Sequence, residues 1–157
     1  MIILGVDPGT RFTGYGLIEK NGRGIQHIDN GLIAPSSKME IPLRLKQIFE
    51  GIQKLIQQFS PSEIALEDVF MAKNVKSSLK LGYARGVVML AAAIQGVSVY
   101  EYPPAQVKQA ITGFGQATKE QMQKMVKIHL KLKEVAQEDA TDALAVALCH
   151  CQTKRFK

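Results

Sequence analysis

Four acidic residues that lie far apart in the sequence stand where folds place functional groups. Asp7 and Glu67 each close a short apolar run, and Asp139 and Asp142 stand near the start of an apolar helical pattern. Carboxylates that meet in one place repel one another strongly, and bound cations make such a cluster tolerable. We therefore predict that Asp7, Glu67, Asp139 and Asp142 meet in a metal site.

Each of these residues also has an ordinary structural explanation. An Asp followed by Pro-Gly, as at Asp7, is a common turn former. Asp139 and Asp142 have the i, i+3 spacing of one helix face, and such a pair near a helix N-terminus commonly caps the helix or matches its dipole. Taken singly, the structural explanations are favoured. The four residues together favour the metal site.

The elements that would position these residues follow from the hydrophobic pattern. Residues 2–6 form an apolar run typical of a buried strand, and the Pro-Gly pair after Asp7 marks a turn. Strand-like segments at 12–19 and 25–34 flank an Asn-Gly turn. The chain therefore begins with a predicted three-stranded antiparallel meander.

The period of the pattern then changes to that of a helix. Apolar residues between Leu45 and Phe59 recur at spacings of three and four, with a proline in the first turn and a Ser-Pro pair after the end. Residues 64–66 form a short apolar run, so we expect a fourth strand that ends at Glu67.

Further helices and one strand complete the expected order. A helix capped by Asn74 or Ser77 precedes a fifth strand at 97–102. After a short helix, the next one opens with a capping-box pattern at Thr118, and a final helix begins near Gln137.

This order of elements predicts the topology. Helices that join the third strand to the fourth and the fourth to the fifth imply crossovers, so part of the sheet is parallel. We predict one α/β domain over residues 1–157, with a mixed five-stranded sheet flanked by helices. Functional sites in such sheets gather at the carboxyl ends of parallel strands. If the first and fourth strands are neighbours, Asp7 and Glu67 emerge at the same edge.

Composition limits the kind of protein. The formal net charge of +6 and the pI near 9.4 favour a nucleic acid or another anionic partner, although solvated lysines explain them equally well. No signal peptide is visible, and the weakly charged stretch 86–100 is short for a membrane span, so we expect a cytoplasmic protein without membrane association. Cys149 and Cys151 would point to opposite sides of a helix, which disfavours a zinc site.

Four long motifs resemble those of the RuvC family of Holliday junction resolvases, which have an RNase H-like fold. The first motif is ILGVDPGTRFTGYG and the second is LEDVFMAKNVKSSLKLGYARG. The third block is YPPAQVKQAITGFGQATKEQMQKMV, and EDATDALAVALCH closes the set. Only the basic tail from Gln152 lies outside the resemblance. Asp68 stands where relatives often carry an uncharged residue, which adds negative charge beside Glu67.

The resemblance implies Mg²⁺-dependent cleavage of four-way DNA junctions by paired nicks, in recombination and DNA repair. It implies that Asp7, Glu67, Asp139 and Asp142 hold two ions, with Mn²⁺ able to substitute. Such a pair activates a water and stabilises the leaving oxygen, and carboxylates suit these hard cations. Lys108 and Lys119 match family lysines near the scissile phosphate, where a cation offsets developing charge.

The same resemblance points to residues that hold DNA. Phe70 matches an aromatic residue that stacks on a base near the junction centre. Residues 69–100 contain no acidic residue, and we expect their cations to contact phosphates, although a solvated helix face would look the same. These cations are Lys73, Lys76, Lys80 and Arg85. Without the family match, Phe70 is equally well explained as a core residue that ends a strand.

Substrate symmetry suggests the assembly. A four-way junction has two equivalent strands to cut, so we expect a two-fold homodimer, with the Gly- and Ala-rich helix 82–96 as a candidate interface. The resemblance also implies a branch-migration complex of the RuvA and RuvB type as partner. The alternatives are an actin-like ATPase suggested by the loop after Asp7, a non-catalytic DNA-binding module, and a related nuclease that acts on RNA.

Overall fold

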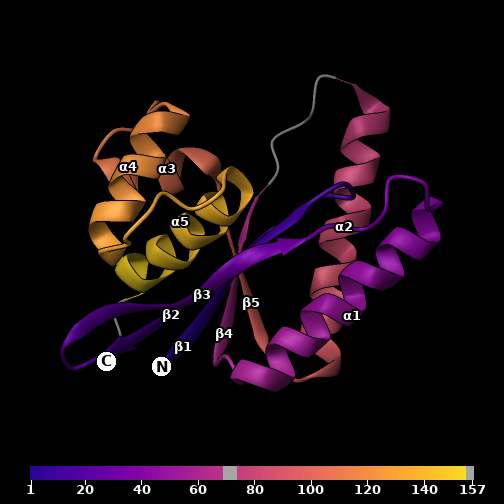
Figure 1. Ribbon diagram of the computed structural model, residues 1–157, viewed down its shortest axis with the longest axis horizontal. Coiled ribbons are helices and arrows are strands. Elements are labelled where there is room, and N and C mark those ends of the chain that lie inside the picture. Colours follow the sequence, from indigo (N-terminus) through magenta and orange to yellow (C-terminus); the bar gives the residue numbers. More distant parts are fainter. Residues whose placement is uncertain (69–73, 155–157) are drawn as a thin grey trace.

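The computed structural model describes residues 1–68 and 74–154 of the chain. One sheet contains the strands β1 (Ile2–Asp7), β2 (Thr13–Asn21), β3 (Gly24–Ile33), β4 (Glu63–Glu67) and β5 (Ser98–Tyr102). Their order across the sheet is β3-β2-β1-β4-β5 (Figure 1). β1 pairs antiparallel with β2 and parallel with β4, and β4 pairs parallel with β5. The prediction of a mixed five-stranded sheet is confirmed.

Helices cover both faces of this sheet. They are α1 (Ile41–Phe59), α2 (Val75–Ile94), α3 (Pro104–Thr112), α4 (Lys119–Leu130) and α5 (Glu138–Thr153). Figure 1 shows α1 and α2 on one face and α3, α4 and α5 on the other. None of the helices in the described residues combines the length and apolarity needed to cross a membrane.

The strands bury side chains on both faces because alternate residues point to opposite sides. In β1, Leu4 and Val6 join the core under α1 and α2, whereas Ile3 joins the core around α5. Ile64 and Ala65 of β4 divide in the same way. Burial on both sides explains why β1 and β4 appear in the sequence as continuous apolar runs.

Two helix starts agree with the capping signals. Asn74 caps α2, and its side chain accepts a hydrogen bond from the backbone N–H of Ser77, which settles the choice between the two candidate caps. Thr118 and Gln121 form the predicted capping box at the start of α4.

The helix α5 lies against the middle of the sheet. Its residues from Ala140 to Cys151 are buried apart from Asp142, and both cysteines are free thiols. Glycines at the contact allow the close approach, because a Cβ atom on Gly5 would collide with the backbone carbonyl of Ala143, and one on Gly14 with that of Asp139.

Candidate active site

Asp7 and Glu67 lie side by side at one edge of the sheet. Each is the last residue of its strand, and the parallel ladder between β1 and β4 pairs Val6 with Leu66, the residues directly before them. Because both strands run the same way, both carboxylates emerge at the carboxyl edge, as predicted.

The helix α5 brings the other two carboxylates to this edge. Asp139 lies in the first turn of α5, and its backbone carbonyl stands directly over Gly14. Gly14 is the ladder partner of Asp7, so the missing side chain at this position lets the start of α5 reach the end of β1. Asp142 follows one turn later in α5.

The carboxylates influence one another electrostatically. Burial, followed by the charges of Asp142, Glu67 and Asp139, raises the pKa of Asp7 to about 8, against a partial offset from Lys119. Burial and then Asp142 raise the pKa of Glu67 to about 7. Burial also raises the pKa of Asp142. A cluster that resists ionisation in this way is one that a cation stabilises.

Two lysines complete the surroundings of the carboxylates. Lys108 of α3 and Lys119 of α4 line a cavity of about 240 Å³ together with Glu67 and Asp142. Both ammonium groups lower the pKa of Glu67, and Lys119 also forms an ion pair with Glu138. These two lysines, found through the family motif, therefore lie beside the carboxylates.

The donor set fits hard divalent cations, because it consists of carboxylate oxygens. Among residues 1–68 and 74–154, however, no three Asp, Glu, His or Cys side chains are arranged as a ready ligand group. Like charges favour side-chain rotamers that keep the oxygens apart, whereas a bound cation favours rotamers that bring them together. The role of the four residues as metal ligands stays a prediction.

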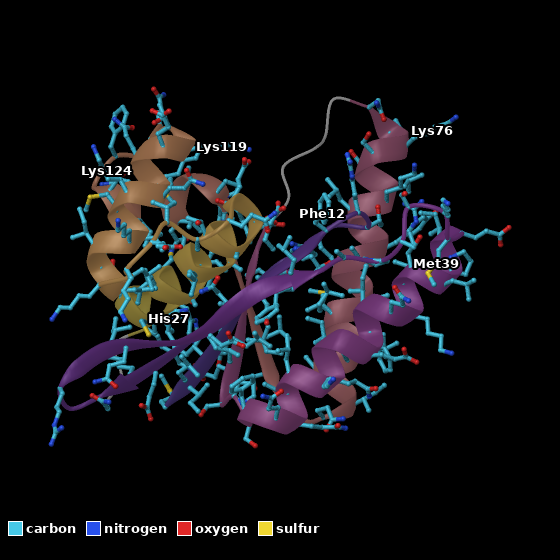
Figure 2. The ribbon with its side chains drawn as sticks, in the orientation of Figure 1. Phe12, His27, Met39, Lys76, Lys119 and Lys124 are labelled. Carbon is cyan, nitrogen blue, oxygen red and sulfur yellow. The ribbon has the colours of Figure 1, made fainter. Side chains whose placement is uncertain are left out.

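A second hollow adjoins the carboxylates on the side of α2. Its volume is about 370 Å³, and Asp139 and Lys80 line it together with Arg11 and Phe12. Arg11 lies over the Phe12 ring at 5.3 Å, and the ring is 38% exposed. Figure 2 shows Phe12 between the helix that carries Lys119 and the one that carries Lys76. Sequence reasoning missed Arg11 and Phe12, although a Phe directly after a Pro-Gly turn was an available signal.

The other predicted DNA contacts have different outcomes. Lys76 and Lys80 are exposed on α2, so both are accessible to phosphate. Phe70 and Lys73 lie outside the described residues. Arg85 differs from these lysines, because its guanidinium contacts Glu101, Asp68 and the backbone of Glu67, and its side chain is only 14% exposed.

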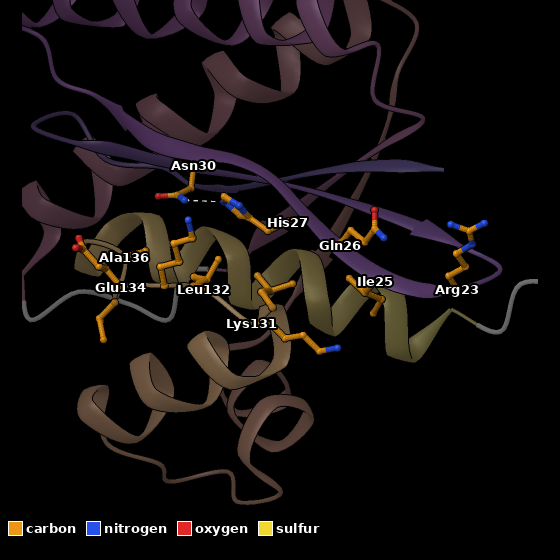
Figure 3. A pocket seen from close by; sticks show the side chains of 12 residues that line it. Arg23, Ile25, Gln26, His27, Asn30, Lys131, Leu132, Glu134 and Ala136 are labelled. Atoms are coloured by element: carbon orange, nitrogen blue, oxygen red, sulfur yellow. Dashed lines mark hydrogen bonds between the residues drawn. The ribbon is translucent and has the colours of Figure 1, made fainter.

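A larger cavity lies elsewhere in the described part of the chain. It has a volume of about 750 Å³ and lies between β3 and the segment that joins α4 to α5 (Figure 3). His27 lines it and is hydrogen-bonded to Asn30 at 2.7 Å. None of the four carboxylates lines this cavity. Glu67 and Asp142, whose pKa values are raised, line the smaller cavity instead.

Comparisons with known proteins agree with the motifs. The sequence model of the family described as Crossover junction endodeoxyribonuclease RuvC matches residues 3–150. The curated protein of that description from Citrifermentans bemidjiense is 54% identical over 98% of this chain and 93% of its own length. The one from Geobacter sulfurreducens is 51% identical over 100% of this chain and 96% of its own length.

Solved structures give the same result. The chain is similar to Thermus thermophilus RuvC in complex with a Holliday junction substrate, with a TM-score of 0.90 and 34% identity over 96% of this chain and 93% of that one. The prediction of an RNase H-like fold is confirmed. A family match that extends over nearly the whole sequence, with about half of all residues shared with the curated relatives, shows that the chain belongs to the RuvC family of crossover junction endodeoxyribonucleases.

Proposed function

We propose that this endonuclease resolves four-way DNA junctions by paired nicks, each made at a centre where Asp7, Glu67, Asp139 and Asp142 hold two Mg²⁺ ions. Mn²⁺ substitutes for Mg²⁺, since both are hard cations that prefer oxygen ligands. When bound, the ions activate a water and stabilise the leaving oxygen. The reaction serves recombination and DNA repair.

One observation carries the proposal. Burial and three other carboxylates raise the pKa of Asp7 to about 8, although the four residues come from three separate segments of the chain. Turn formation and helix capping explain each residue singly but do not require the segments to converge. Convergence at the carboxyl edge of parallel strands supports a catalytic centre.

Two lysines act on the phosphate in this proposal. Lys108 and Lys119 approach the carboxylates from α3 and α4. Their ammonium groups stabilise the negative charge that develops on the scissile phosphate. Lys119 leaves its ion pair with Glu138 to do so, and because this pair is exposed, separating its members costs little.

DNA is held on the other side of the carboxylates. Lys76 and Lys80 of α2 contact phosphates, and Arg11 and Phe12 border the same hollow as Lys80. Phe70, which lies outside the described residues, stacks on an unpaired base, and Lys73 adds a phosphate contact.

The homodimer forms through α2. An apolar stripe lies exposed along this helix, on the side away from its buried residues Ala84 and Val88. A second copy related by a two-fold axis covers this stripe and supplies the second active site. The stripe consists of Leu79, Tyr83, Leu90 and Ile94. Branch-migration proteins of the RuvA and RuvB type deliver the junction in the cytoplasm.

Cleavage assays test the proposal. Purified protein with Mg²⁺ is offered a synthetic four-way junction, a linear duplex and a structured RNA. We expect cleavage of the junction alone, and loss of cleavage with near-normal junction binding for Asp7→Asn and Glu67→Gln. Glu50→Gln, an exposed change on α1, is the matched control for Glu67→Gln. Wild-type cleavage rates in Asp7→Asn would reject the assignment, and ATP hydrolysis without junction cleavage would favour the ATPase alternative.

A further inference from the structure

Arg85 reaches from α2 to the end of the strand that carries Glu67. Its Nη1 donates a hydrogen bond of 2.6 Å to the backbone carbonyl of Glu67. Its Nη2 forms an ion pair with Glu101 of β5 and lies 3.4 Å from Oδ1 of Asp68. One guanidinium therefore joins α2 to the carboxyl ends of β4 and β5.

These contacts argue against a phosphate-binding role for Arg85. Two carboxylates surround its single positive charge, so the local net charge is negative and repels a phosphate. The guanidinium donors face protein acceptors, and the side chain is 14% exposed. Lys80 on the same helix is exposed and borders the hollow that contains Asp139, so it provides a direct contrast.

The main chain of Glu67 needs such a support. The ladder between β4 and β1 ends at Leu66, one residue before Glu67. On the other side, Glu67 pairs with Tyr102, and the N–H of Asp68 donates to the Tyr102 carbonyl at 2.7 Å. Arg85 binds the carbonyl of Glu67 and therefore fixes the peptide plane between Glu67 and Asp68.

We propose that Arg85 is a positioning residue, which holds the backbone of Glu67 so that its carboxylate points toward Asp7 and Asp142. The proposal rests on the proposed function, because it takes Glu67 as part of the catalytic centre. The planar fork of arginine serves several acceptors at fixed angles, and an ammonium group cannot reproduce that arrangement. Asp68 belongs to this support, since its charge beside Glu67 is balanced by Arg85.

Arg85→Gln and Lys80→Gln form the matched pair for the test. We expect Arg85→Gln to lower the single-turnover cleavage rate at saturating protein about 10–100-fold, as for other residues that orient a ligand. Junction affinity in EDTA, and its dependence on salt, should stay as in wild type. Lys80→Gln should instead weaken junction binding, with a salt slope smaller by about 0.9.

Arg85→Lys keeps the charge and should lose activity like Arg85→Gln. Glu101→Gln removes one partner of Arg85 and should also lower the cleavage rate while junction binding stays intact. This variant provides the test if Arg85→Gln does not fold. A reduced salt slope for Arg85→Gln together with a normal saturated rate would overturn the positioning role. If Glu67→Gln itself cleaves normally, the proposed function fails. If only the Arg85 and Glu101 variants cleave normally, the proposed function stands and this inference fails.

Discussion

Nε2 of His150 lies 2.6 Å from Oε2 of Glu63, and the ring of His150 is fully buried. Its Nδ1 lies 2.6 Å from the hydroxyl of Tyr102. The carboxylate of Glu63 can only accept a hydrogen bond, so Nε2 of His150 donates to it, and Nδ1 is paired with the Tyr102 hydroxyl. Glu63 also pairs with Lys154, just after the end of α5. The network joins β4, β5 and α5, from Glu63 at the amino end of β4 to Tyr102 at the carboxyl end of β5.

Breaking this network should destabilise the fold. His150→Phe keeps an aromatic ring but removes the ring nitrogens that pair with Oε2 of Glu63 and with the Tyr102 hydroxyl, so we expect a loss of about 2–4 kcal/mol in the free energy of unfolding. Urea denaturation measures it. The control is Lys46→Ala, which removes the exposed pair with Glu50 and should cost less than about 1 kcal/mol. Equal losses of unfolding free energy for the two variants would show that the buried pair stabilises the fold no more than the exposed pair does.

The ionisation of Asp7 should make stability depend on pH. The Asp7 pKa is raised from 3.8 to about 8 by burial and then by its neighbouring carboxylates, so between these values the folded chain binds more protons than the unfolded chain. Raising the pH through this window therefore lowers the free energy of unfolding. Glu67, with its pKa raised from 4.5 to about 7, acts in the same direction.

In EDTA, we accordingly expect the Tm to fall between pH 5 and pH 8, and to fall less for Asp7→Asn. Added Mg²⁺ should raise the Tm more at pH 8 than at pH 5, because only ionised carboxylates bind the ion well. Thermal denaturation at several pH values checks both expectations. Identical pH profiles for wild type and Asp7→Asn would contradict the pKa assignment.

Gly14→Ala should damage the active site through packing alone. The added methyl collides with the backbone of Asp139 and pushes the start of α5 away from β1. We expect a loss of about 1–3 kcal/mol in stability from overpacking, and a loss of cleavage larger than that destabilisation explains at 25 °C. Gly22→Ala is the control, because no atom lies within 4 Å of a Cβ placed at Gly22 in the hairpin. Normal cleavage by a folded Gly14→Ala protein would speak against the close approach.

A charge on α2 should separate the proposed dimer. Leu90 is 54% exposed within the apolar stripe, and Leu90→Glu buries a carboxylate wherever a second copy covers it. Sedimentation at micromolar concentration should show dimer for wild type and monomer for Leu90→Glu. Ile128→Glu, at a residue of α4 that is 61% exposed, provides the matched control and should stay dimeric. A wild-type protein that sediments as a monomer would remove the dimer from the proposal.

Hydrophobic runs and capping residues predicted the fold well, because the same residues are the ones that tertiary packing buries or caps. The end of an apolar run located Asp7 and Glu67 correctly, since a parallel strand buried on both faces must stop where it becomes polar. The approach of Asp139 to Asp7 was harder to predict from the sequence, because it depends on the missing side chain of Gly14 in another strand.

The partners of Arg85 were not predicted for a similar reason. It lies in an acid-free stretch that suggested phosphate binding, yet Asp68 and Glu101, which bound that stretch on either side, are its partners. Neither neighbour lies close to Arg85 along the chain, so only the folded topology brings the three together. Charge patterns along a sequence identify cations but not the groups that neutralise them.

The pairing of β4 with α5 has a consequence for the distance between Glu67 and Asp142. Glu67 lies four positions after Glu63, about 13 Å along a strand, and His150 lies eight positions after Asp142, about 12 Å along a helix. The two elements therefore have matched lengths, fastened at their far ends by His150 and Glu63. The pair of His150 with Glu63 therefore helps to set the register between α5 and β4 at the ends of these elements that lie farthest from Asp142 and Glu67.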